Sequence, residues 1–147
     1  MEYTLAIIKP QAREKGYTGA MISQIEKAGF VIQQIRCVHL TKKEAAAFYR
    51  VHRERPFYEE LCAYMGANVC IPMVLAKENA VNDFREFIGA TNPAEAAAGT
   101  LRKQFGTSID HNAIHGSDSP ENAATEIAFF FPTQVGKNMT GSPLSKV

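Results

Sequence analysis

Helix-like and strand-like patterns alternate along the 147-residue chain in an order that predicts an α+β fold. Apolar, β-branched runs occur at residues 4–8, 30–40, 69–76 and 127–131, and stretches with helical periodicity separate them. The resulting order β-α-β-β-α-β predicts a ferredoxin-like α/β sandwich around a four-stranded antiparallel sheet. Two further helical patterns between the second and third strands predict an inserted helical hairpin.

The first strand, residues 4–8, is expected to end at Lys9, because Pro10 cannot donate a hydrogen bond to a sheet. Lys9 would then lie at the carboxyl end of a buried strand. After a loop, apolar residues at helical spacing predict a helix over residues 19–28, and Gly29 is a typical residue to end it.

The second strand, residues 30–40, is followed by the helical hairpin. Thr41 and Glu44 form a capping box, in which each side chain can accept a hydrogen bond from a free backbone amide at the helix start. We expect this helix to reach about residue 51. Pro56 suits the first turn of the second helix of the hairpin.

The third strand, residues 69–76, contains Pro72. Proline has no amide hydrogen to donate within a sheet, so we expect a bulge or a locally unpaired edge there. Residues 79–88 have helical periodicity, and Gly89 closes that helix. Residues 90–118 show little periodicity, and so long a loop in a compact domain is usually functional.

A short helix is expected to begin at Ser119, because serine followed by proline and glutamate is a typical helix start. The apolar, aromatic run at residues 127–131 predicts the last strand. We therefore expect one domain over residues 1–132. Gly, Thr, Asn, Ser and Pro gather in residues 133–147, which predicts a loosely held C-terminal tail.

Composition and charge exclude several classes of protein. The net charge of +1 gives no general attraction to nucleic acid or to an anionic membrane, so any anion site must be local. Cys37, Cys62 and Cys70 form no CxxC pair, which disfavours a disulfide framework and favours reduced thiols. The apolar run 5–8 is too short for a signal peptide or a membrane span. We expect a cytoplasmic protein without a membrane or specific nucleic-acid partner.

The segment 110–119 concentrates groups that can carry chemistry and has few apolar side chains. His115, flanked by small polar residues, suits nucleophilic or acid–base work, although an ordinary surface loop could also contain it. His111 stands four residues earlier, the spacing of an HxxxH zinc site. That spacing brings two ligands together only on a helix, and Asn112 and Gly116 disfavour one, so we do not expect zinc.

Polar and basic residues from several loops could form a phosphate site. Guanidinium groups and hydroxyls match phosphate oxygens, and Lys9, Arg85, Arg102, Thr91 and Asn112 would make an anion cradle if the fold brought them together. Each of them taken singly reads as an ordinary surface residue. The chain has no GxxxxGK[ST] and no GxGxxG motif, which disfavours a P-loop or a Rossmann site.

Residues 112–118, Asn-Ala-Ile-His-Gly-Ser-Asp, resemble the active-site signature Asn-x-x-His-Gly-Ser-Asp of nucleoside diphosphate kinases. Other segments resemble the same family in order and at matching intervals, over about residues 3–131: Leu5–Pro10, Arg55–Phe57, Gly89–Ala94 and Gly99–Arg102. The resemblance implies a catalytic domain that performs ping-pong transfer. The γ-phosphate of a nucleoside triphosphate, chiefly ATP, would pass to Nδ1 of His115 and then to a nucleoside diphosphate.

The resemblance also implies roles for residues around the histidine. Glu126 matches the acid that holds the other ring nitrogen and so fixes the tautomer of the imidazole. Ser117 matches the hydroxyl that bonds near the histidine and the glutamate. Tyr49 matches the phenol beside the cleft, and Lys9 would reach toward the transferred phosphate.

The nucleotide contacts carry over by position as well. The base would lie between Phe57 and Ile109, with Leu61 adding apolar surface, and stacking of this kind tolerates any base. Lys9 and Asn112 would bond the ribose hydroxyls. Phosphate oxygens would be bound by His52, Arg85, Thr91 and Arg102. Mg²⁺ would arrive bridging the β- and γ-phosphates, with no direct protein ligand.

Four regions depart from the usual family pattern, and none of them removes a matched catalytic residue. Gln11 stands where an acid is usual, and Asn68 belongs to a segment that replaces the usual Ser-Gly-Pro before the strand containing Pro72. Phe84 precedes Arg85 at a position where a small residue is common. Asp110-His111 replaces a Gly-containing pair. These departures bear on affinity and local geometry.

The fold plan alone would also suit a non-catalytic nucleotide-binding or regulatory oligomer, because fold does not determine function. The second strand, residues 30–40, lies at a sheet edge in this plan, and an apolar edge can pair with a second copy across a two-fold axis. The family resemblance likewise implies a homo-oligomer, a tetramer or a hexamer built from dimers.

Overall fold

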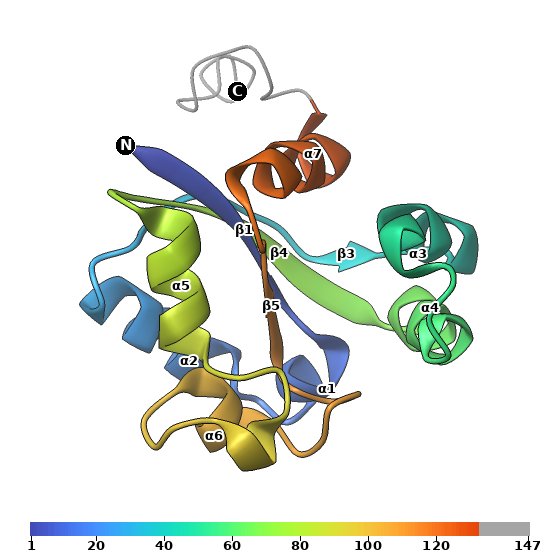
Figure 1. Cartoon of the computed structure of the whole chain (residues 1–147), viewed down its shortest axis with the longest axis horizontal. Coiled ribbons are helices and arrows are strands. Elements are labelled where there is room, and N and C mark those ends of the chain that lie inside the picture. The colour runs from blue at the N-terminus through green and yellow to red at the C-terminus, as the bar shows by residue number, and fades with distance from the viewer. Residues whose placement is uncertain (133–147) are drawn as a thin grey trace.

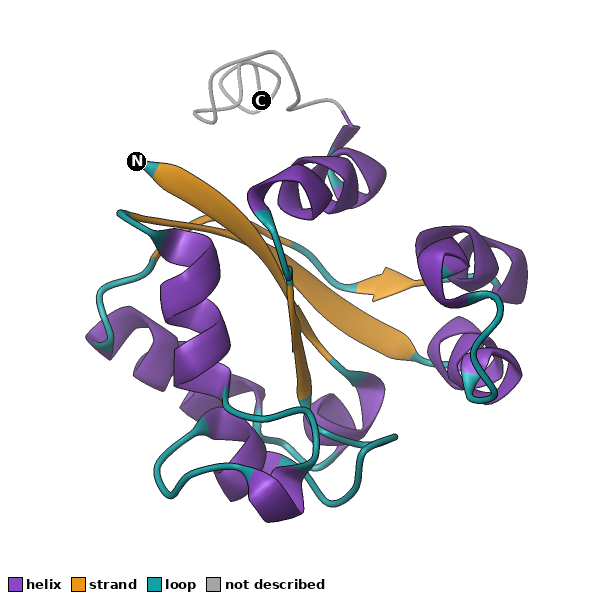
Figure 2. Cartoon of the chain, in the orientation of Figure 1, coloured by secondary structure: helices purple, strands orange, loops and turns teal. Residues whose placement is uncertain are grey.

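The computed structural model describes residues 1–132, in which one twisted antiparallel sheet carries helices on both faces (Figures 1 and 2). The elements are β1 (Glu2–Ile8), α1 (Pro10–Glu14), α2 (Thr18–Lys27), β2 (Val31–Ile35), β3 (Val38–His39), α3 (Lys42–Phe48), the 3-10 helix η1 (Arg50–His52), α4 (Tyr58–Ala67), β4 (Val69–Lys77), α5 (Ala80–Ile88), the 3-10 helix η2 (Pro93–Glu95), α6 (Leu101–Phe105), β5 (Ile114–Gly116) and α7 (Pro120–Phe130). The strand order within these residues is β2-β4-β1-β5, and β3 also pairs with β4. The expected α+β sandwich is confirmed.

Strand β1 lies in the middle of the sheet and contributes to a hydrophobic cluster on each face. Ala6 and Ile8 belong to the cluster under α2, α5 and α6, whereas Leu5 and Ile7 belong to the cluster under α3, α4 and α7. All four side chains are fully buried. Alternate residues of a strand point to opposite faces, so a continuous apolar run is what a strand covered on both sides requires.

The break expected at Pro72 is present. Strand β4 pairs with β1 over residues 71–77. On its other edge, β4 pairs with β2 over residues 73–76 and with β3 over residues 69–70, so the ladder is interrupted between them. The carbonyl of Pro72 accepts from the Arg36 amide at 3.2 Å in this interval. The amide nitrogen and carbonyl of a strand residue point to the same edge, so the ring nitrogen faces the gap between β2 and β3. The prediction of one continuous strand over residues 30–40 was wrong, because the same interruption separates β2 from β3.

The prediction for the last strand was also wrong. Residues 127–131 do not form a strand, because α7 runs to Phe130. Ser119 caps this helix by accepting from the Asn122 amide at 3.0 Å, as expected. Ala123, Ile127 and Phe130 then have helical spacing on the face that packs against the sheet. The strand that completes the sheet is β5, which lies inside the segment expected to be a loop.

The helical hairpin forms as expected, although its helices are shorter. Thr41 Oγ1 accepts from the Glu44 amide at 3.0 Å, and Glu44 Oε1 accepts from the Thr41 amide at 2.8 Å, so the capping box is confirmed. Helix α3 ends at Phe48, and η1 follows it. Gly66 lets the end of α4 approach α3 closely, because a Cβ there would lie 2.5 Å from the Lys42 Cα.

Two further differences concern the loops. Residues 10–14, expected to be a loop, form α1, and the region 90–118 contains η2, α6 and β5. The C-terminal tail expected over residues 133–147 lies outside the described residues. No helix in residues 1–132 has the length and hydropathy needed to cross a bilayer.

Candidate active site

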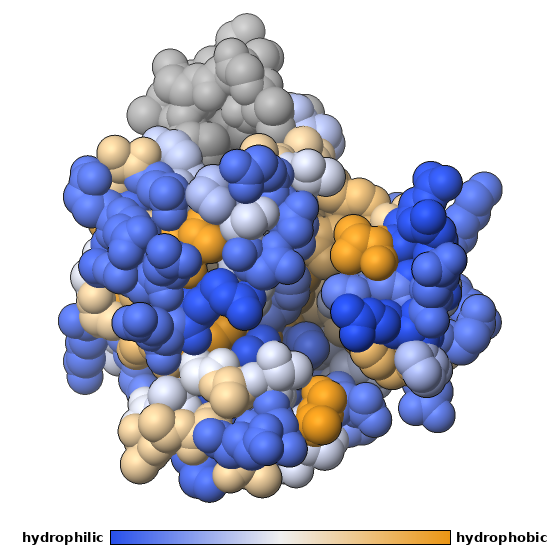
Figure 3. All heavy atoms as spheres, in the orientation of Figure 1, coloured by the Kyte–Doolittle hydropathy of each residue, from blue (hydrophilic) through white to orange (hydrophobic). Residues whose placement is uncertain are grey.

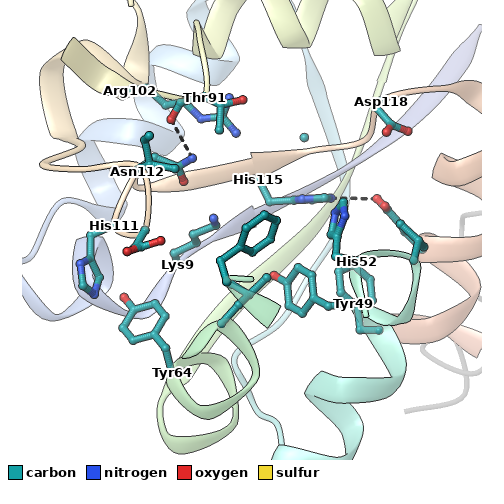
Figure 4. A pocket seen from close by; sticks show the side chains of 18 of the residues that line it. Lys9, Tyr49, His52, Tyr64, Thr91, Arg102, His111, Asn112, His115 and Asp118 are labelled. Carbon is teal, nitrogen blue, oxygen red and sulfur yellow. Dashed lines mark hydrogen bonds and ion pairs between the residues drawn. The ribbon is translucent and has the colours of Figure 1, made fainter. Parts of the chain in front are cut away.

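A cleft of about 460 Å³ lies between the helical hairpin on one side and the segment from α5 to β5 on the other. Figure 3 shows the surface hollowed between these two parts of the molecule, and Figure 4 shows the side chains that point into it. All the site residues predicted from the sequence line it, except Ser117: Lys9, Tyr49, His52, Phe57, Leu61, Arg85, Thr91, Arg102, Ile109, Asn112, His115 and Glu126. Sequence positions more than a hundred residues apart therefore meet in one cavity.

Strand β5 presents His115 to this cleft. The strand pairs with β1, with His115 opposite Ile7. Just before it, the Ile114 amide donates to the Asn112 carbonyl at 3.0 Å across Ala113, whose φ is +79°. A non-glycine residue in this region stores roughly 1–3 kcal/mol of strain. The tight turn lets Ile114 enter the core while His115 points to the opposite face.

The imidazole of His115 is held by a short network. Its Nε2 lies 2.8 Å from Glu126 Oε1, and the Ser117 hydroxyl donates to the same oxygen at 2.7 Å (Figure 4 draws the first contact). Ser117 is itself fixed, because its oxygen accepts from the Leu5 amide at 3.1 Å. A carboxylate can only accept, so Nε2 carries the proton and Nδ1 keeps a free lone pair.

Apolar side chains line the outer part of the cleft on both sides. Phe57 on the hairpin is 39% exposed and Ile109 on the opposite loop is 55% exposed, which is unusual for side chains of this size. Leu61 lies behind them on α4. The Phe57 ring also packs on His52, with ring centroids 5.7 Å apart. This slot offers two apolar walls to a flat ring system.

The inner part of the cleft gathers positive charge. Arg102 is fixed by backbone carbonyls, because its guanidinium donates to the Ile114 carbonyl at 2.9 Å and to the Gly89 carbonyl at 2.9 Å. Burial, and then the nearby Arg85, lower the pKa of Arg102 to about 10. Four carboxylates also line the cavity, but Lys9 and Arg85 both lie close enough to Arg102 to interact with it electrostatically, so this part of the cleft would favour an anion.

Two polar groups point into the site without a partner in residues 1–132. Asn112 donates through Nδ2 to the Thr91 carbonyl at 3.0 Å, but its Oδ1 is buried and unpaired. The Tyr49 hydroxyl is likewise buried and unpaired, and burial raises its pKa. Buried polar atoms are normally satisfied, so these two unpaired atoms are unusual features of the site.

Lys9 is another strongly perturbed group of the cleft. It is only 9% exposed, and burial, followed by repulsion from Arg102, lowers its pKa from 10.5 to about 8, while Asp110 opposes the decrease. The difference corresponds to about 3 kcal/mol. A lysine whose pKa is lower in the folded state destabilises the fold fully below pH 8, and this cost fades as the pH rises from about 8 to 10.5.

We therefore expect Lys9→Met to raise the free energy of unfolding at pH 7 by up to about 3 kcal/mol while it lowers activity. The gain should shrink as the pH approaches 10.5. Denaturant unfolding of both proteins at pH 7 and pH 10 measures it. An unchanged or lower stability of the variant at pH 7 would contradict this reading of the site.

Several residues of the cleft were not predicted from the sequence: Phe48, Val51, Glu60, Tyr64, Asp110, His111, Gly116, Asp118 and Asn122. Phe48 packs edge-on to His115, with ring centroids 5.8 Å apart, and so restricts the imidazole. Two adjacent aromatic residues at a helix end, such as Phe48-Tyr49, are typical of a hydrophobic core. The sequence therefore did not indicate that Phe48 lines the cleft. No group of three or more potential metal ligands gathers anywhere in residues 1–132.

The chain matches known proteins over most of its length. The family model described as nucleoside diphosphate kinase matches residues 2–135. The nucleoside diphosphate kinase of Chlorobium chlorochromatii is 58% identical over 134 residues, which are 91% of this chain and 96% of that protein. That of Geotalea uraniireducens is 56% identical over 131 residues, which are 89% of this chain and 96% of that protein.

Solved structures agree. The Aquifex aeolicus nucleoside diphosphate kinase superimposes with a TM-score of 0.87 at 44% identity, covering 88% of this chain and 94% of that one. The Encephalitozoon cuniculi nucleoside diphosphate kinase superimposes with a TM-score of 0.89 at 31% identity and full coverage of both chains.

Proposed function

The chain belongs to the nucleoside diphosphate kinase family and is a phosphotransferase, and on this premise we propose that His115 carries the phosphate between the two nucleotides. Family membership decides against the non-catalytic oligomer that the fold plan alone allowed. The observation that supports His115 is its contact with Glu126, 2.8 Å from Nε2 to the carboxylate, which leaves Nδ1 as the nucleophile on the cleft side.

In the first half-reaction, the Nδ1 lone pair forms a bond to the γ-phosphorus of a nucleoside triphosphate. The bond from that phosphorus to the bridging oxygen breaks, and its electron pair leaves with the diphosphate. In the second half-reaction, a terminal oxygen of another diphosphate attacks the same phosphorus and the P–N bond breaks. Glu126 stabilises the positive charge on the ring of the phosphohistidine, and Ser117 holds the carboxylate in place.

We assign the remaining contacts by the chemistry of each part of the cleft. The base lies in the slot between Phe57 and Ile109, and Lys9 and Asn112 bond the ribose hydroxyls. The basic inner end fits a polyphosphate, which His52, Arg85, Thr91 and Arg102 bind. Mg²⁺ carried by the nucleotide would neutralise part of the phosphate charge.

The proposal is tested by incubating the protein with Mg²⁺ and γ-³²P-ATP. We expect an acid-labile, base-stable label on the protein, and we expect that label to transfer to any nucleoside diphosphate added afterwards. A protein that transfers phosphate without ever carrying the label would rule out the phosphohistidine route.

We also propose that the protein is a homo-oligomer built from dimers, a tetramer or a hexamer. Strand β2 lies at the edge of the sheet, and Val31 and Ile35 on it are 53% and 46% exposed. An apolar edge strand of this kind favours pairing with a second copy. Light scattering at micromolar concentration would refute this by showing a monomer.

The three free cysteines support a cytoplasmic location.

A further inference from the structure

The two walls of the base slot come from segments that are distant in sequence, and Gln11 in α1 makes a hydrogen bond to each segment. The Gln11 amide donates to the Tyr64 hydroxyl on α4 at 2.6 Å. The Gln11 side chain donates through Nε2 to Thr107 Oγ1 at 3.2 Å, at the base of the loop that carries Ile109. These two hydrogen bonds form what is called here the Gln11 bridge.

The loop on the far side of the bridge is itself closed. The Thr107 amide donates to the His111 carbonyl at 2.9 Å, and the His111 amide donates to Ser108 Oγ at 3.2 Å, so Ile109 lies within a four-residue turn. The His111 ring also packs edge-on against the Tyr64 ring, with centroids 4.8 Å apart. The hairpin and the loop are therefore joined by a ring of contacts through Gln11, Tyr64, His111 and Thr107.

This ring of contacts lies at the slot end of the cleft. Tyr64 and His111 line the cleft together with Leu61 and Ile109. Figure 4 shows Tyr64 and His111 side by side, on the opposite side of the view from His52 and Asp118. Gln11 does not line the cleft, so it touches neither wall surface directly.

We propose that Gln11 and Tyr64 are positioning residues that hold the Ile109 loop and the Phe57 wall at stacking distance before a nucleotide arrives. The inference rests on the proposed placement of the base between Phe57 and Ile109. A base gains from stacking only when both faces are covered, and a preformed slot avoids the entropic cost of ordering the loop on binding. The bridge therefore acts on nucleotide affinity and not on the transfer step.

Decay of the phosphorylated protein with increasing ADP separates affinity from transfer, because it gives a half-saturating concentration and a maximal rate. For Gln11→Ala and Tyr64→Phe we expect the first to rise by about 3–10-fold and the second to stay within about two-fold. Gln11→Glu should restore affinity, because its carboxylate can accept from the Thr107 hydroxyl. The matched control is Gln24→Ala, which removes two exposed side-chain hydrogen bonds to Gln104 outside the cleft.

A second readout is independent of catalysis. Hydrogen exchange of the amides at residues 107–111 should be faster in nucleotide-free Gln11→Ala than in wild type or Gln24→Ala, and bound ADP should restore protection. Affinity for a fluorescent ADP analogue reports on the bridge even if wild type carries no phosphate label. Equal affinity and exchange in Gln11→Ala and Gln24→Ala, or a loss confined to the maximal rate, would overturn the proposal.

Discussion

Replacing His115 with alanine is expected to lower phosphate transfer by about 10⁴-fold or more, because the variant lacks the atom that accepts the phosphate. The protein should remain folded. Alanine keeps the backbone pairing of β5 with β1 opposite Ile7, and the cationic end of the cleft, with Arg102 fixed by carbonyls, does not depend on the imidazole. Nucleotide binding should therefore survive the loss of rate.

Steady-state transfer from ATP to a second diphosphate measures the rate, and a fluorescent ADP analogue measures binding. His39→Ala serves as the matched control, because His39 lies exposed in β3 and does not line the cleft. It should label with γ-³²P-ATP to the wild-type level. Label retained by His115→Ala would show that another side chain carries the phosphate.

The second large effect is expected at Glu126. Its carboxylate accepts from Nε2 of His115 at 2.8 Å and from the Ser117 hydroxyl at 2.7 Å, and it is only 19% exposed. Glu126→Ala frees the ring to rotate and change tautomer, so we expect the rate to fall by about 10²-fold with little change in nucleotide affinity. Glu126→Gln retains an oxygen that can accept from Nε2 and loses only the charge. Its loss should be smaller, about 10-fold.

Single-turnover formation of the phosphorylated protein measures this step without product release. Glu121→Ala is the control, because Glu121 is exposed on the same helix and lines no part of the cleft. If Glu126→Ala formed phosphoprotein as fast as Glu121→Ala, the carboxylate would have no part in the reaction.

Local signals in the sequence correctly predicted where two helices begin. Thr41 with Glu44, and Ser119 with the proline after it, mark helix starts because their side chains satisfy amides only a few residues away. Pro72 predicted the interruption of the outer ladder for an equally local reason, since it lacks an amide hydrogen.

The last strand could not be found in this way. Strand β5 has three residues in a polar stretch, so it shows no alternating pattern, and it is a strand only because β1 lies beside it. The apolar run from Ile127 to Phe131 fits a strand and a buried helix face equally well, and the helix that begins after Ser119 extends through most of it.

The functional site, too, could be predicted only in part from the sequence. The sequence placed Lys9 at a strand end and His115 in a reactive segment, but spacing alone could not bring them together with Arg85 and Arg102. The family resemblance supplied that convergence. Phe48 against His115, and the Gln11 bridge to Tyr64, were not predicted, because they depend on how the hairpin packs on the rest of the fold.

The central claim is that Glu126 holds Nε2 of His115 so that Nδ1 takes the phosphate. The most direct test is nuclear magnetic resonance of the phosphorylated protein with ¹⁵N-labelled histidine, in which phosphorus–nitrogen coupling identifies the bonded atom. We predict coupling to Nδ1 of His115, with Nε2 still carrying its proton. Phosphate on Nε2, or on any other residue, would contradict the account.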